Sequence, residues 1–304
     1  MAKLVIGSNK QNGIPAIVKE VGVQPSLGTK TITANGTYNA SSDNYDGYSS
    51  VTVNVPSVSE PYLELAIVSS VLRNSTTTSR LVPLSGFTDI AEFALAAAYQ
   101  NNRNISAGIV FADLTQISGS YACYNAFRGS SVTSVSIPNL QVVSGSHACW
   151  GMFAVSDAAS ADLSNLETIS GQDGCGSMFL LSKIETINLS KLKTVSSANG
   201  CASMCERCNQ LAQIVFPLLD TITGSAAFYR AFAVSGITSI SFPALKSTSF
   251  GTNSNQFSSM LSGVTGCTVH FPSNLQSVIG SWSAVQNGFG GTNTTVLFDL
   301  PATE

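Results

Sequence analysis

The apolar residues of this chain recur with a fixed long period. Seven leucines head the successive periods, at intervals of 26, 26, 26, 27, 26 and 30 residues. They are Leu114, Leu140, Leu166, Leu192, Leu219, Leu245 and Leu275. A constant interval of about 20 to 50 residues is typical of proteins built from stacked repeats. The pattern therefore predicts a solenoid.

A strand-like segment precedes the leucines. In residues 132–138, 184–189, 211–217 and 237–243, apolar side chains occupy the first, fourth and sixth positions. The last two of these positions lie two residues apart, which is the period of a strand with one buried face. These segments are therefore expected to be strands with one buried face.

A second apolar segment follows the leucines after a turn rich in glycine and serine. In residues 120–127, 147–153, 174–179, 200–205 and 226–232, apolar side chains recur at i, i+3 and i+4. This spacing is typical of one face of a short helix. One repeat is thus predicted to be a strand, a turn, a short helix and a return loop, and stacking of repeats must supply the core.

The chain before the repeats has a different pattern. Two segments of alternating polarity within residues 28–56 surround an Asn-Gly and an Asp-Gly pair, which predict turns between strands. Residues 89–101 are expected to form a helix that replaces an incomplete first repeat. The predicted divisions are a small all-β module (1–57), a linker and N-terminal cap (58–104), the repeats (105–275) and a C-terminal cap that closes the last strand edge (276–304).

The repeat resembles the leucine-rich-repeat family, in the type found in surface proteins of gut bacteria and in gut phages. The L-x-x-L-x-L spacing carries the resemblance, with Met-Phe before the strand and Pro after it, over about residues 90–275. The resemblance implies an α/β solenoid of ~26-residue units, with a parallel sheet on one face and short helices on the other. It implies binding rather than chemistry.

The segment within residues 28–56 resembles a module found in virion structural proteins of tailed bacteriophages. That resemblance implies that residues 1–57 attach the chain to other virion proteins, as part of a multimeric assembly. The apolar run near the N-terminus, residues 4–6, is too short for a secretory signal, and no uninterrupted apolar run reaches the length of a membrane span. We therefore expect neither a signal peptide nor membrane insertion, and a virion protein assembled in the host cytoplasm.

Composition narrows the possible partners. Only 10% of the residues are charged, with 14 Lys and Arg against 17 Asp and Glu, whereas Ser and Thr together occupy 71 of 304 positions. So few cations argue against nucleic-acid binding, because phosphate neutralisation needs clustered Lys and Arg. His147 and His270 have no partner in a recognisable catalytic or metal-binding motif. We expect no enzyme activity, catalytic residue, metal or cofactor.

One cysteine motif carries an opposing hypothesis. Cys201, Cys205 and Cys208 have a C-x3-C-x2-C spacing, which can hold an iron–sulfur cluster in a radical enzyme. However, Cys201 is also the last of four cysteines spaced 26 residues apart, after Cys123, Cys149 and Cys175. Small buried thiols that pack in successive repeats explain that spacing without a cluster. Disulfides between neighbouring repeats are a further alternative, since stacked strands lie within disulfide range.

The repeat alignment also predicts which residues of the sheet point outward, and thus a possible binding face. We name these twelve residues the outer strip: Ser134, Ser136, Ser160, Asp162, Thr186, Asn188, Gln213, Val215, Ser239, Ser241, Thr268 and His270. They are small, polar and nearly uncharged, and could hydrogen-bond a host glycan or a flat protein surface. A solvated sheet without a ligand fits the same residues.

Three functions remain open from the sequence. The first is a bacteriophage virion structural protein (a tail or head fibre, or a capsid decoration) that displays the repeats for adhesion or host recognition. The second is a bacterial cell-surface adhesin. The third is the radical enzyme of the cysteine motif. The expected absence of a signal peptide favours the first over the second.

Overall fold

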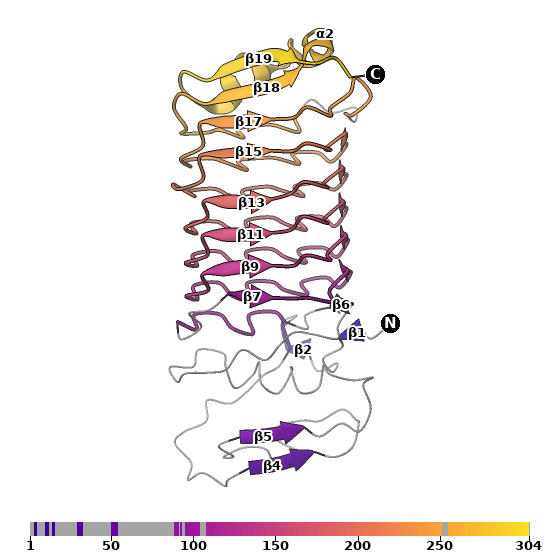
Figure 1. The fold of residues 1–304 in the computed structure, drawn as a ribbon, viewed down its shortest axis with the longest axis vertical. Coiled ribbons are helices and arrows are strands. Elements are labelled where there is room, and N and C mark those ends of the chain that lie inside the picture. Colours follow the sequence, from indigo (N-terminus) through magenta and orange to yellow (C-terminus); the bar gives the residue numbers. More distant parts are fainter. Residues whose placement is uncertain are drawn as a thin grey trace.

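The structure is a computed structural model of the 304-residue chain. It describes residues 88–90, 92, 95–103, 108–250 and 255–303, together with the backbone of five short strands before residue 54. The described chain is a parallel β-solenoid of about eight turns, here called coils, with a repeat of about 26 residues. In Figure 1 the coils stack along the long axis of the molecule. The predicted repeat and its parallel strands are confirmed.

One side of the solenoid is a seven-stranded parallel sheet of two-residue strands in the order β1-β6-β8-β10-β12-β14-β16. Its strands are β1 (Lys3–Leu4), β6 (Asp89–Ile90), β8 (Gln116–Ile117), β10 (Val142–Val143), β12 (Thr168–Ile169), β14 (Thr194–Val195) and β16 (Thr221–Ile222). The last five of them, β8 to β16, each begin two residues after a repeat leucine, where the sequence predicted only a turn. The solenoid therefore has a second sheet that the apolar spacing did not reveal.

The predicted strands form the other sheet, which is divided in two. Its first part contains β7 (Ile109–Val110), β9 (Ser134–Ser136), β11 (Ser160–Asp162) and β13 (Thr186–Asn188). Its second part contains β15 (Gln213–Val215), β17 (Ser239–Ser241), β18 (Thr268–Pro272) and β19 (Thr295–Leu300). Ser182, before β13, contacts Cys208, before β15, and these two residues are 26 positions apart. The two strands themselves begin 27 residues apart, at Thr186 and Gln213. One extra residue therefore lies between Cys208 and β15, and the sheet breaks at the same place.

The third side corrects the prediction of short helices. We name it the turn ribbon: residues 119–130 and the equivalent residues 145–156, 171–182, 197–208 and 224–235. Each of these segments is a run of turns and not a helix. Every second backbone N–H group donates a hydrogen bond to a carbonyl of the next coil, as Cys123 N–H does to the Ala148 carbonyl at 2.7 Å. The N–H groups between them donate to the carbonyl three residues earlier in the same coil, as Ala126 N–H does to the Cys123 carbonyl at 3.0 Å. The backbone hydrogen bonds of the ribbon thus join neighbouring coils.

The period of the turn ribbon is four residues rather than the 3.6 of a helix. Tyr121, Asn125 and Gly129, spaced by four, have positive φ values of 55°, 53° and 70°. Side chains are buried in adjacent pairs, Ala122 with Cys123 and then, four residues on, Ala126 with Phe127. Cys123, Ala126 and Phe127 satisfy the helical spacing as well, which is why the sequence pattern predicted a helix.

The predicted helix at residues 89–101 is also absent. Residues 89–90 form strand β6, and residues 95–101 are a further coil of turns that donates to the next one, beginning with Leu95 N–H to the Ala122 carbonyl at 2.7 Å. Strand pairing between coils thus extends from β6 to β19. It begins before and ends after residues 105–275, the range predicted for the repeats. The helices of the described chain are η1 (Ser273–Leu275), α2 (Gln276–Ile279), α3 (Ser283–Gln286) and η2 (Gly288–Gly290).

One continuous apolar core fills the solenoid from Ile90 to Phe289. Aromatic rings stack along it from coil to coil, with ring centres 4.9 Å apart for Tyr99 and Phe127 and 5.3 Å apart for Phe127 and Phe153. A second column runs from Phe216 through Phe242 to Phe271, with ring centres 5.2 and 5.4 Å apart. Stacked rings and aliphatic side chains thus fill the described core from coil to coil.

Little of the predicted N-terminal module is described. β4 (Thr29–Ile32) and β5 (Ser50–Val53) pair in parallel, and β2 (Lys10–Gln11) and β3 (Ile14–Pro15) pair antiparallel. The predicted Asn-Gly and Asp-Gly turns lie outside the described residues. Within the described chain, no helix has the length and apolar character needed to cross a membrane.

Candidate functional site

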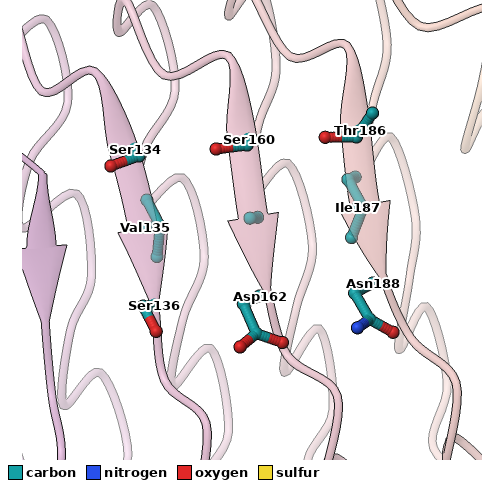
Figure 2. Close-up of a pocket in the computed structure, with 9 residues that line it drawn as sticks. Ser134, Val135, Ser136, Ser160, Asp162, Thr186, Ile187 and Asn188 are labelled. Atoms are coloured by element: carbon teal, nitrogen blue, oxygen red, sulfur yellow. The ribbon is translucent and has the colours of Figure 1, made fainter.

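The structure places the outer strip on the predicted strands, in register from coil to coil. Ser160 pairs with Ser134 on one side and Thr186 on the other, and Asp162 pairs with Ser136 and Asn188. Figure 2 shows this half of the strip as side chains that alternate with the inward residues Val135 and Ile187. In the second half, Gln213, Ser239 and Thr268 form one row, and Val215, Ser241 and His270 form the other.

A shallow hollow of about 530 Å³ lies over the first half of the strip. Its lining consists of residues from three strands: Ser134, Val135, Ser136, Ser160, Ala161, Asp162, Thr186, Ile187 and Asn188. Asp162 supplies the one carboxylate among them, and the polar remainder are hydroxyls and the Asn188 amide. This chemistry suits hydrogen bonds to a neutral polyol or to an exposed polar backbone.

Asp162 and Asn188 are held in place by their own backbone. The Oδ1 atom of Asp162 accepts a hydrogen bond from the Ser164 N–H at 3.1 Å, and that of Asn188 accepts one from the Ser190 N–H at 3.1 Å. These are Asx-turns, which fix a side chain at the end of a strand. Asn188 is exposed and Asp162 is half-buried, so both side chains can still form hydrogen bonds with a ligand.

The break between β13 and β15 divides the outer strip into two halves of different chemistry. The second half contains an exposed apolar side chain, Val215, which is 50% accessible. It also contains His270, whose Nδ1 lies 3.0 Å from Asp299 on the next coil. The hydroxyl, carboxylate and amide groups of the hollow therefore form a more uniform polar surface than the second half.

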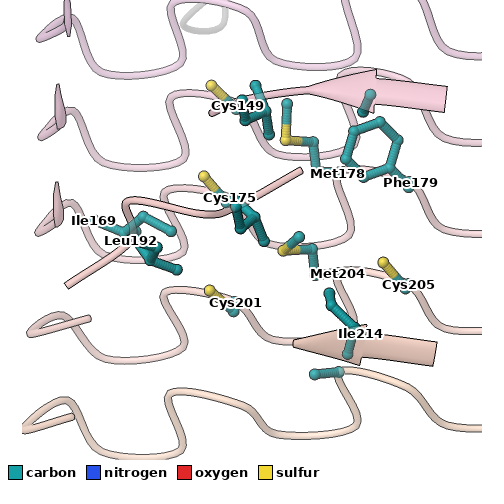
Figure 3. Close-up of a cluster of buried hydrophobic side chains, with 14 of the residues drawn as sticks. Cys149, Ile169, Cys175, Met178, Phe179, Leu192, Cys201, Met204, Cys205 and Ile214 are labelled. Carbon is teal, nitrogen blue, oxygen red and sulfur yellow. The ribbon is translucent and has the colours of Figure 1, made fainter. Parts of the chain in front are cut away.

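The cysteine motif lies within the apolar core. All seven cysteines are free and buried. Among the residues that the structure describes, no group of three or more His, Cys, Asp or Glu side chains could hold a metal ion. Cys208 donates to the Phe179 carbonyl at 3.0 Å. Figure 3 shows Cys149, Cys175 and Cys201 aligned from coil to coil within the apolar core, with Cys205 in a separate place.

Packing explains both the position and the size of Cys205. It occupies the place of Phe153 and Phe179 in the column of stacked rings, which ends there. The coil that contains Cys205 has a larger residue elsewhere in the core, because Phe216 stands where the preceding coil has Leu189. Cys205, Phe216 and Leu189 are all buried. A small residue opposite a larger one conserves core volume, as close packing requires.

Burial makes most of the thiols poor nucleophiles. It raises the pKa of Cys123 and of Cys201, and a hydrogen bond with Cys175, together with burial, raises the pKa of Cys149. Cys208 differs, because hydrogen bonds from Cys205 and Ser182 lower its pKa despite burial. Thiolate chemistry also needs access to a reaction partner, and Cys208 is fully buried.

The sequence missed an aromatic cluster on the outside of the turn ribbon. The ring of Tyr121 stacks on His147 with centres 4.8 Å apart, and Tyr124 stacks on Trp150 at 5.0 Å. His147 also lies 2.9 Å from the Ser146 hydroxyl and 3.6 Å from Asp173. The alignment of these aromatic residues at the 26-residue period was the signal that could have revealed the cluster. Because the rings stack on one another, the cluster stabilises neighbouring coils.

Ion pairs also join neighbouring coils. Arg230 Nη2 lies 2.6 Å from Glu206 Oε1, and Lys183 Nζ lies 2.7 Å from Asp157 Oδ1. Burial opposes ionisation of Glu206, but hydrogen bonds from Arg230 and Ser203 and the Arg230 charge outweigh it and lower the pKa of Glu206. Opposite charges on successive coils avoid the repulsion that like charges at this spacing would produce.

Comparison of the chain with models of known protein families, with curated proteins and with solved structures gives no significant match.

Proposed function

We propose that this chain is a non-enzymatic structural protein of a bacteriophage virion, a fibre or a capsid decoration, that displays its solenoid for adhesion or host recognition. The observation that carries the proposal is the solenoid itself. Its interior is filled with stacked apolar side chains, and its coils are joined on all three sides by hydrogen bonds. Such a body suits a rigid element that presents a surface.

The resemblance of residues 28–56 to a module of tailed-phage structural proteins supports attachment to a particle through residues 1–57. The resemblance of the repeats to leucine-rich repeats of gut-bacterial and gut-phage proteins supports a role in binding. The structure replaces the expected helices with the turn ribbon, so the resemblance concerns the repeat and its strand spacing rather than the complete unit.

The experiment is to fractionate a lysed culture of the host that produces the chain and to follow the protein with an antibody against the solenoid. The proposal expects the protein in purified particles at a fixed copy number, with gold label on their surface. A bacterial adhesin, the alternative, would be found in the cell envelope before lysis. Recovery in the envelope and not in particles would exclude the virion assignment.

Within this function, the hollow is the part of the outer strip that we assign to the host ligand, a neutral glycan or polar peptide surface. Asp162→Arg places a long cation in the hollow and should abolish attachment to host cells. The matched control is Gln213→Arg, which adds the same side chain to an exposed position on the second half of the strip. The assignment would be contradicted if both variants lost attachment equally, or if neither variant lost it.

A further inference from the structure

Strand β19 leaves one edge of the four-stranded sheet β15-β17-β18-β19 open. It is six residues long and pairs with β18, and within the described chain it has no other strand partner. After β19 the chain returns along the side of the solenoid, where the Asn274 amide donates to the Thr303 carbonyl at 2.6 Å. The described residues that follow β19 therefore do not cover its edge. The predicted cap thus covers β18 and presents a new edge.

The backbone groups at this edge can be identified. Thr295 donates to the Cys267 carbonyl at 2.9 Å, so its polar backbone groups point toward β18. The pairing with β18 is regular from Thr295 to Leu297 and shifts register between Leu297 and Leu300. Because backbone directions alternate along a regularly paired strand, the N–H and C=O groups of Val296 point away from β18. An extended partner strand could form hydrogen bonds with these groups.

The side chains at the edge are apolar and incompletely covered. Phe298 stacks on Phe271 with ring centres 5.8 Å apart, and so extends the column of Phe216, Phe242 and Phe271. Val296 and Phe298 pack only partly buried against the core, and Leu297, on the outer face, is 36% exposed. The strand has one charged side chain, Asp299, which His270 already contacts. Natural edge strands are usually protected by charges, prolines, β-bulges or a covering segment. β19 has one charge, Asp299, and one register shift against β18, between Leu297 and Leu300, and its residues Thr295, Val296 and Leu297 have neither.

We propose that two copies of this chain associate through antiparallel pairing of their β19 strands, which joins two solenoids end to end. The sequence of β19 is complementary to itself in a register centred on Leu297. Leu297 then faces its counterpart, Val296 faces Phe298 of the other copy, and Thr295 faces Asp299. A register centred on Phe298 would instead place Asp299 opposite Leu297. The chosen register keeps apolar residues together and forms an isologous interface.

The test is sedimentation velocity combined with small-angle X-ray scattering on the full chain, at protein concentrations up to about 100 µM. The proposal expects a dimer whose maximum dimension is close to twice that of the monomer. Val296→Pro removes an edge N–H without removing a bond to β18, and Leu297→Lys places two cations opposite each other. Either change should weaken dimerisation at least about tenfold.

The matched control is Val215→Lys, which removes an exposed apolar side chain from β15, at the opposite end of the same sheet from β19, and should leave dimerisation unchanged. Far-UV circular dichroism and the thermal midpoint verify that each variant is folded, and Leu297→Lys remains informative if the proline variant is not. A protein that stays monomeric would overturn the proposal. So would a compact side-by-side dimer, or a dimer unaffected by Leu297→Lys.

Discussion

The side-chain oxygen of Asn125 occupies the space that a β-carbon on Gly151 of the next coil would need, since the two atoms would be 2.3 Å apart. Gly151 also has a positive φ of 60°. Gly151→Ala should therefore reduce the free energy of unfolding by about 1–3 kcal/mol, through backbone strain and the clash together. Denaturant unfolding followed by circular dichroism measures this change.

A double variant separates the two causes. Asn125→Gly vacates the space and retains a residue suited to positive φ. In that background Gly151→Ala should cost only the backbone part, about 1 kcal/mol. An equal cost in both backgrounds would show that Asn125 does not restrict Gly151.

The aromatic column should contribute a large share of stability. Phe153 is fully buried between Phe127 and Phe179. Phe153→Ala should destabilise the protein by about 3–5 kcal/mol, because the removed ring leaves a cavity in a close-packed core. Leu181→Ala is the control, since Leu181 is 48% exposed on the same ribbon. Comparable losses for the two variants would contradict the packing described.

The Glu206–Arg230 pair predicts a pH dependence of stability. The folded pKa of Glu206 lies below its ordinary value of 4.5, so the pair stabilises the folded state fully above that value. The contribution is lost as the pH falls through the folded pKa. Glu206→Gln should therefore cost about 1 kcal/mol at neutral pH and less in acid. Urea titrations at both pH values check this, and a cost independent of pH would refute it.

The buried cysteines predict an unreactive folded protein. In native buffer none of the seven thiols should react with a water-soluble thiol reagent, whereas all seven should react in denaturant. Ser144→Cys, at an exposed position, provides a fast-reacting control. Rapid native labelling of Cys205 or Cys208 would show that the core opens there.

The sequence predicted the repeat length and the strands whose apolar residues alternate, because one buried face imposes a period of two. It could not distinguish the turn ribbon from a helix, because Cys123, Ala126 and Phe127 are buried in either. The buried small residue before each repeat cysteine, such as Ala122 or Gly174, was the available signal for a period of four. The second sheet was missed because strands of two residues contain no full alternation.

The outer strip was predicted from the same alternation, and its register follows from the constant repeat. The hollow could not be predicted, because it depends on how three neighbouring strands lie together around the small side chain of Ala161. The division of the strip at β15 was present in the sequence as the single 27-residue interval, but the interval alone did not show where the extra residue enters.

We propose that residues 1–57 attach this chain to a virus particle and that the solenoid projects from it. Cryo-electron microscopy of purified particles tests this attachment. We expect density for residues 1–57 enclosed by a neighbouring virion protein, with the stacked coils extending outward. Particles that lack the chain, or that carry it with residues 1–57 exposed and the solenoid enclosed, would contradict it.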